Sequence, residues 1–138
     1  MSDQDLVGLV LEFVREMNAL QRRYGSLMPQ SRREGRMDVL LNEYREEAER
    51  MYGRWLTRRN RSCYKALSNP PTFSALEKMT LSTVERRGNR AVVELLTSGG
   101  CLDFQFNLFC KAGEWRINSF KQRYHSEHRI YHWVYGDF

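Results

Sequence analysis

The sequence lacks the features that mark a membrane or secreted protein. No apolar run approaches the roughly 18 residues needed to cross a bilayer, and the first apolar stretch, Leu6–Val14, follows the acidic residues Asp3 and Asp5. A signal peptide instead begins with positive charge and ends in a small-residue cleavage site. We therefore expect a cytoplasmic protein that has no membrane partner.

Cysteine is scarce and shows no paired spacing. The chain has three cysteines, Cys63, Cys101 and Cys110. An odd number of cysteines at wide spacing fits neither a disulfide framework nor a zinc or redox motif. Such cysteines are typical of small buried side chains in a reducing compartment.

Catalytic sequence motifs are also missing. The chain has no glycine-rich phosphate loop, no nucleophile elbow and no metalloprotease His-Glu pair. The sequence therefore favours a binding protein over an enzyme, and it predicts no cofactor and no catalytic residue.

The composition is that of one globular domain with a basic surface. Its 138 residues are 41% hydrophobic and carry a net charge of +5, and domains commonly have about 100–150 residues. Arginines gather at Arg22–Arg36 and Arg58–Arg61 without a nucleic-acid motif, which argues against nucleic acid as the partner. Arginine-rich surfaces also suit protein interfaces, because guanidinium groups bind carboxylates in a bidentate way.

Two amphipathic helices are predicted in the first 59 residues. Apolar residues recur at spacings of three and four over Asp3–Tyr24 and again over about Met37–Arg59, which places them on one helical face. Ser2 or Asp3 can cap the first helix and Gly25 can end it. The polar connection that follows, residues 26–35, contains Pro29.

An antiparallel sheet is predicted beyond Pro70 and Pro71, where helical continuation stops and the apolar period changes to two. The expected strands are Met79–Arg86, Ala91–Thr97, Leu102–Cys110 and Glu114–Arg123. The expected turns are Arg87-Gly88-Asn89, where Gly and Asn suit positive φ, Ser98-Gly99-Gly100 and Lys111-Ala112-Gly113. The fold class is α+β, with helices at about 3–59 packed on a sheet at about 72–124 in a single domain, 1–138.

Alternation along the strands predicts which side chains form the core. We expect one face of the sheet to pack on the helices. The sheet residues are Leu102, Phe104, Phe106, Leu108, Trp115 and Ile117, and the helix residues are Leu9, Phe13, Tyr44, Met51 and Trp55.

The last stretch, His125–Phe138, is rich in aromatic residues and can form either a further strand or a tail folded back on the domain. On a helix, His125, His128 and His132 would align toward a metal, with a cysteine or Glu127 completing the ligands. The neighbouring residues favour an extended chain that scatters the histidines, so no metal site is predicted.

Asp103 is a second candidate for chemistry. A partly buried aspartate near a His or Tyr can act as a general acid or base. Alternation instead places Asp103 on the outer side of the sheet, opposite Phe104 and Phe106, which favours a polar surface residue.

The order of elements carries a family resemblance. Amphipathic helices, a proline-containing connector and antiparallel hairpins ending in Gly-Glu-Trp-Arg-Ile-Asn-Ser-Phe, residues 113–120, resemble the nuclear transport factor 2-like superfamily. Within it, the chain looks most like the immunity proteins of bacterial polymorphic toxin systems. The resemblance rests on the strand entry Arg90-Ala91-Val92-Val93, the strand through Phe104 and Phe106, and the 113–120 segment, and it spans about Asp3–Tyr124.

The resemblance implies a curved sheet wrapped on the helices as a cone, and a protein that binds and blocks a co-produced toxin without chemistry of its own. Two alternatives come from the same superfamily: an isomerase- or dehydratase-like enzyme that uses the cone cavity, and a scaffold that forms homodimers. A basic surface would complement an acidic toxin surface and speed the encounter. The candidate partner-binding residues combine the outward polar row with the aromatic tail: Asp103, Gln105, Asn107, Arg116, Asn118, Tyr131, Trp133 and Tyr135.

Overall fold

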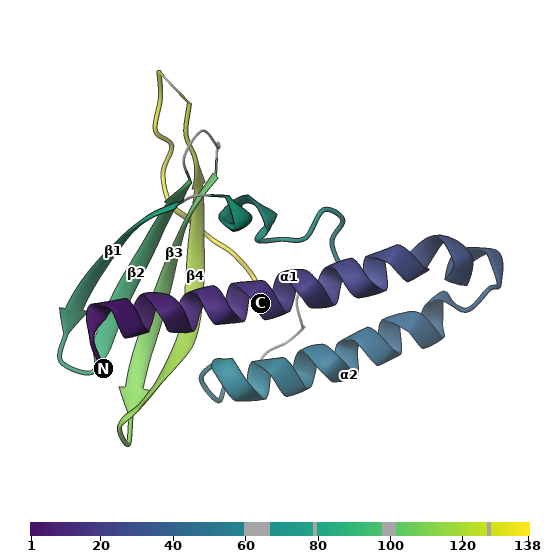
Figure 1. Cartoon of the computed structure of the whole chain (residues 1–138), viewed down its shortest axis with the longest axis horizontal. Helices are drawn as coiled ribbons and strands as arrows, with labels where there is room; N and C mark the ends of the chain where they lie inside the picture. The colour runs from purple at the N-terminus through teal and green to yellow at the C-terminus, as the bar shows by residue number, and fades with distance from the viewer. Residues whose placement is uncertain (60–66, 79, 98–101, 127) are drawn as a thin grey trace.

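The computed structural model describes residues 1–59, 67–78, 80–97, 102–126 and 128–138, and within them it shows an α+β fold (Figure 1). Two helices, α1 (Asp3–Arg33) and α2 (Met37–Trp55), precede a short 3-10 helix, η1 (Ser74–Glu77), and an antiparallel sheet. The predicted α+β class, with N-terminal helices packed on an antiparallel sheet, is therefore confirmed. Figure 1 shows α1 crossing the sheet, while the far half of the α1–α2 hairpin extends beyond it.

The first helix begins as predicted but is longer than predicted. Ser2 caps it through a reciprocal capping box with Asp5. The expected end at Gly25 is wrong, because α1 continues through Pro29 to Arg33. Gly25 lacks the positive φ of a terminating glycine, whereas Gly35 has φ 68°. Packing of Tyr24 against Tyr44, with ring centroids 5.6 Å apart, helps to hold the extra turns against α2.

The second helix ends earlier than predicted, at Trp55 instead of Arg59. Leu56 is extended and forms a parallel bridge with Ile117, and the Thr57 amide donates to the Ile117 carbonyl at 2.8 Å. The backbone therefore leaves the helix to join the sheet. Helical periodicity could not reveal this, because the competing partner lies about 60 residues further along the chain.

The sheet is a meander in which each strand pairs with the next, in the order β1-β2-β3-β4-β5. The strands are β1 (Thr80–Arg87), β2 (Arg90–Thr97), β3 (Leu102–Lys111), β4 (Glu114–Tyr124) and β5 (Val134–Tyr135). The first four confirm the predicted strands to within a residue or two, while Met79 and the expected turn at Ser98-Gly99-Gly100 lie outside the described residues.

Two tight turns join the first four strands. The β1–β2 turn has positive φ at Gly88 alone, so the positive φ expected at Asn89 is wrong. The β3–β4 turn has φ 53° at Ala112 and φ 77° at Gly113, the two positive values that a two-residue type I′ turn requires.

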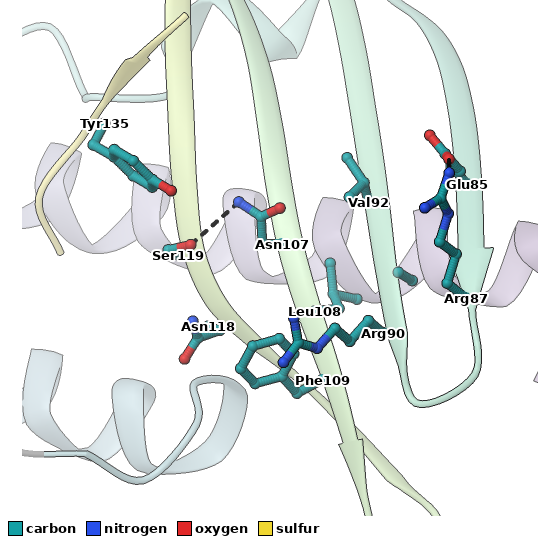
Figure 2. A pocket seen from close by; sticks show the side chains of 11 residues that line it. Glu85, Arg87, Arg90, Val92, Asn107, Leu108, Phe109, Asn118, Ser119 and Tyr135 are labelled. Atoms are coloured by element: carbon teal, nitrogen blue, oxygen red, sulfur yellow. Dashed lines mark hydrogen bonds and ion pairs between the residues drawn. The ribbon is translucent and has the colours of Figure 1, made fainter.

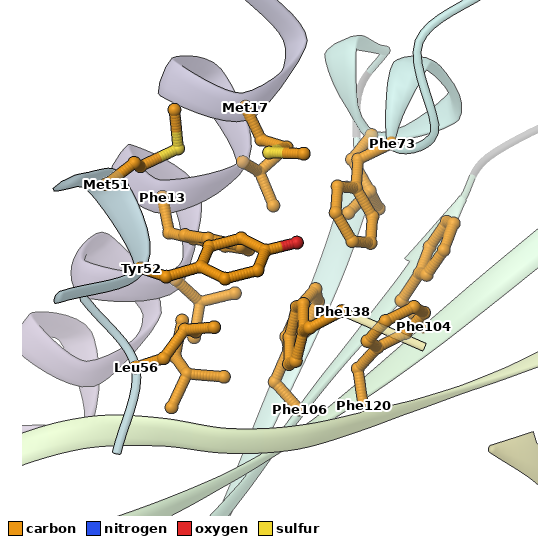
Figure 3. Packing of buried hydrophobic residues seen from close by; sticks show 14 of the residues in the cluster. Phe13, Met17, Met51, Tyr52, Leu56, Phe73, Phe104, Phe106, Phe120 and Phe138 are labelled. Atoms are coloured by element: carbon orange, nitrogen blue, oxygen red, sulfur yellow. The ribbon is translucent and has the colours of Figure 1, made fainter. Parts of the chain in front are cut away.

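The core lies between the helices and one face of the sheet, and aromatic rings fill its centre (Figure 3). The Phe73 ring contacts the rings of Phe104, Phe106 and Phe120 at centroid distances of 5.2–5.7 Å, within the range of favourable aromatic pairs. Most predicted core residues are buried; Leu9, Trp55 and Leu102 are only partly buried against the same core. Phe73, Phe120 and Phe138 were not predicted as core residues.

Two buried amides on α1 hold the segment before η1. Asn18 exchanges two hydrogen bonds with the Phe73 backbone, at 3.1 and 3.2 Å. Gln21 accepts from the Thr72 amide at 2.7 Å and donates to the Thr72 hydroxyl at 3.1 Å. These bonds satisfy buried backbone groups and fix Phe73 at the centre of the core.

The C-terminal tail combines both predicted arrangements, a strand and a segment folded back on the domain. After β5 pairs with β4, the Gly136 amide donates to the Phe120 carbonyl at 3.0 Å. The Phe138 ring is buried against Phe13, Tyr52 and Phe120. The end of the described chain is therefore part of the core.

The described helices contain no segment that is both long and apolar enough to cross a membrane. Cys110 is a free, half-buried thiol, while Cys63 and Cys101 lie outside the described residues.

Candidate protein-binding face

The sheet face that points away from the helices, here called the outer face, holds a shallow cavity of about 420 Å³. Figure 2 shows side chains from β1 to β5 around it, with α1 behind the sheet. Asn107 lies near its centre and donates to Ser119 at 3.2 Å, while Tyr135 of β5 forms one rim. Four strands and the tail therefore contribute to one continuous surface.

Two of the predicted outward residues occupy this face as expected. Gln105 donates to Glu94 on the neighbouring strand at 2.9 Å, and Asn107 lines the cavity. Both side chains are partly exposed, so another molecule can reach them.

Asp103 does not belong to the exposed row. Only 3% of its surface is accessible, and the expectation of an exposed position is wrong. Its carboxylate accepts from the Thr97 amide at 3.1 Å and from Arg123 Nε at 3.2 Å, and His125 Nδ1 lies 3.0 Å away. Asp103 thus ties the ends of β2 and β4 together instead of presenting a charge to a partner.

Arg116 is also less available than predicted. Its guanidinium donates to the carbonyls of Gly53, Arg54 and Leu56, the first at 2.6 Å, and pairs with Glu114 at 3.0 Å. A cation on the free carbonyls at a helix C-terminus stabilises that end. Arg116 therefore joins α2 to β4, and its replacement is expected to disturb the fold as well as any interface.

Asn118 marks an irregularity that the sequence analysis missed. Asn107 pairs with Ser119 but Leu108 pairs with Ile117, so Asn118 is an extra residue in β4, a β-bulge. Beyond the bulge, the alternation of β4 side chains between the two faces is shifted by one residue. Ser119, Lys121 and Arg123 therefore share the outer face. The sequence does hold a signal for the bulge, because the apolar residues Trp115 and Ile117 are at odd positions and the apolar residue Phe120 is at an even one. All three side chains are buried.

Exposed apolar side chains gather in the segment Lys121–Tyr135, here called the aromatic hairpin. Ten large hydrophobic side chains are exposed in the described part of the chain, and five lie in this segment. Those five are Tyr124, Ile130, Tyr131, Val134 and Tyr135, with exposures of 45–68%. Such a cluster of apolar side chains on a surface is typical of an interaction site.

Cations stack on the aromatic rings of this hairpin. Arg123 lies 4.2 Å from the centroid of Trp133, Lys121 lies 4.6 Å from that of Tyr135, and Arg129 lies 4.6 Å from that of Tyr131. These contacts limit the rotamers of the rings, which lowers the entropy lost on binding. The predicted residues Tyr131, Trp133 and Tyr135 are thus brought together with cations that the prediction did not include.

The three histidines of the tail are separated by its extended path. His125 is half-buried beside Asp103, whereas His128 and His132 are exposed. Among the described residues, no group of three or more His, Cys, Asp or Glu side chains is arranged to hold a metal ion. Glu127, considered as a further ligand, lies outside those residues.

Comparison with known proteins gave no match: no protein-family model, no curated protein and no solved structure is significantly similar to the chain.

Proposed function

We propose that this protein binds a partner protein through the outer face of the sheet and the aromatic hairpin, and that the partner is a bacterial toxin which the binding neutralises. In this proposal the chain is an immunity protein with a nuclear transport factor 2-like fold, and it acts by covering a surface of the toxin. The observation that carries the proposal is that one short hairpin holds half of the exposed large hydrophobic side chains among the described residues.

The composition of this surface supports a protein partner. Interface centres are enriched in Tyr, Trp and Arg, and these residues dominate binding energies. The hairpin supplies Tyr131, Trp133 and Tyr135 with three stacked cations, and Tyr135 connects it to the outer-face cavity. The hairpin would supply the apolar contacts and the polar face beside it the hydrogen bonds.

The interior is less suited to the alternative of an enzyme with a cone cavity. The space between the helices and the sheet holds the rings of Phe73, Phe120 and Phe138, packed at centroid distances of 4.8–5.2 Å (Figure 3). A small substrate could enter only if these rings moved.

Co-expression tests the proposal. The chain is produced with the toxin encoded beside its own gene, and co-purification and survival of the producing cells are measured. Trp133→Ala and Tyr135→Ala should each weaken binding by about 2 kcal/mol or more, as expected for residues at the centre of an interface. Leu81→Ala is the control, because Leu81 is also exposed, at 70%, but lies on β1 at the opposite edge of the sheet.

The proposal requires that the two hairpin variants lose protection at low expression while they remain folded and Leu81→Ala protects fully. Equal protection by all three variants would show that the hairpin is not the binding site. Absence of any complex with the toxin would overturn the immunity role itself.

A further inference from the structure

A second cavity, here called the basic cavity, lies at the end of the sheet where β2 begins and the β3–β4 turn projects. Its volume is about 690 Å³, within the range of pockets that hold ligands of several side chains' size. It shares Arg90, Phe109 and Asn118 with the outer-face cavity. The two cavities are therefore adjacent.

The chain builds this cavity by bringing the end of α2 to the sheet. Arg116 donates to the carbonyls of Gly53 and Arg54 near the end of α2. The Thr57 amide donates to the Ile117 carbonyl, and the Thr57 hydroxyl donates to Asn118 Oδ1 at 2.8 Å. These bonds bring Arg58 and Arg59, which follow α2, to the same cavity that Lys111 at the β3–β4 turn lines.

The cavity has a large excess of positive charge. Five cationic residues and one acidic residue line it, a net charge of 5 − 1 = +4. Its one acid, Glu114, is paired with Arg116. Within the described part of the chain, Arg58, Arg59, Arg90 and Lys111 form no ion pair. A concave site of this kind concentrates anions, because the fields of its cations add.

The wall chemistry favours carboxylates on a peptide over nucleic acid. Proteins that bind single-stranded nucleic acid offer open aromatic faces on which bases stack. Here the Arg90 guanidinium lies over the Phe109 ring at 5.1 Å, which covers that face (Figure 2). Guanidinium groups bind carboxylates with paired, charge-assisted hydrogen bonds, and Phe109 and Cys110 add an apolar wall for a neighbouring side chain.

We infer that the basic cavity receives an acidic segment of the partner protein. Carboxylates of this segment pair with Arg58, Arg59 and Lys111, and one apolar side chain packs on the wall formed by Phe109 and Cys110. The inference rests on the proposed function, since it names the chemistry of the partner segment that binds beside the aromatic hairpin.

The test uses a fluorescein-labelled peptide of four glutamates around one phenylalanine, and a second peptide with glutamines in place of the glutamates. Binding to the full chain is measured by fluorescence anisotropy at low and at physiological salt. The double variant Arg58→Ala/Arg59→Ala removes two cations from the cavity. The matched control, Arg32→Ala/Arg33→Ala, removes two exposed cations from the end of α1.

The acidic peptide should bind and the glutamine peptide should bind at least about tenfold more weakly, with an affinity that falls as salt rises. Arg58→Ala/Arg59→Ala should weaken acidic-peptide binding about tenfold or more, and the control double variant by less than about twofold. Equal losses in both double variants, equal binding of both peptides, or no binding would overturn the inference.

The two proposals can fail separately. A toxin that co-purifies equally well with the wild-type chain and with Arg58→Ala/Arg59→Ala contradicts the acidic-segment site and leaves the immunity role intact. Specific peptide binding without any toxin complex supports the site while the immunity role fails.

Discussion

On the inner face of β3, Phe104, Phe106 and Leu108 are fully buried, whereas Gln105, Asn107 and Phe109 on the outer face are only partly covered. Six successive side chains of one strand thus alternate between the buried core and the partly exposed outer face. Each buried large apolar side chain contributes about 1.5–3 kcal/mol of stability. The outer residues contribute little burial, which leaves their side chains available for binding.

A second difference between the two faces lies in their charge. The inner face packs on the helices through apolar groups, and the two buried amides of α1, Asn18 and Gln21, are satisfied by the Thr72–Phe73 segment. The outer face and its neighbouring turn carry cations, several of which stack on rings. Under the proposed function, the inner side of the sheet therefore provides stability and the outer side provides recognition.

The largest expected difference between the two faces concerns two adjacent residues of β3. Phe106→Ala should reduce the free energy of unfolding by about 3–5 kcal/mol, because it leaves a cavity in a packed aromatic core. Asn107→Ala should change it by less than about 1 kcal/mol, because Asn107 is partly exposed. Urea denaturation measures both. Similar losses in the two variants would mean that the faces are not divided in this way.

The tail offers a smaller test of the inner face. A Cβ at Gly136 would lie 2.2 Å from the Phe120 ring, so Gly136→Ala must displace the tail or the ring. Overpacking of this kind destabilises by about 1–3 kcal/mol. Gly53→Ala is the control, because no atom lies within 4 Å of its added Cβ. Thermal denaturation should show a lower Tm for Gly136→Ala alone; an unchanged Tm would mean that the tail does not pack on Phe120.

The smallest expected effect concerns pH. Burial raises the pKa of the Tyr44 phenol, partly opposed by a hydrogen bond from Gln21. A raised folded pKa contributes stability below the unfolded value of about 10, and this contribution is lost as the pH rises through the folded pKa. The free energy of unfolding should therefore fall as the pH rises above about 10, and less steeply in Tyr44→Phe. Equal slopes in both proteins would contradict a buried phenol.

The parts of this structure that follow from local pattern could be predicted from the sequence. Alternation in residues 102–110 correctly identified Phe104, Phe106 and Leu108 as core, and helical spacing identified Phe13 and Met51. These predictions depend only on period, which a single chain shows directly.

The errors have a common physical origin in contacts between distant parts of the chain. Asp103 is on the expected side of the strand, but Arg123 and His125 cover it. Arg116 faces away from the core as alternation predicts, yet it binds α2 carbonyls about 60 residues earlier in the sequence. The burial of Phe138 depends on a tail path that no local periodicity specifies.

The candidate binding face could be predicted only in part, because contacts between distant parts of the chain also form it. The aromatic residues Tyr131, Trp133 and Tyr135 could be selected by composition, and the structure places them beside the outer face. The basic cavity could not be predicted, because Arg58 and Lys111 line one cavity only once the residues after α2 pack against β4.

Backbone hydrogen exchange, measured for the chain alone and in complex with the proposed partner toxin, tests the division between the two faces most directly. We expect the added protection of amides from exchange on binding to be concentrated in the aromatic hairpin, Lys121–Tyr135, and around Arg90 and Lys111 at the basic cavity. Amides of α1 and α2 should exchange equally in both states. Added protection confined to the α1–α2 hairpin, around Arg32 and Arg33, would contradict the account and place the binding surface on the helices.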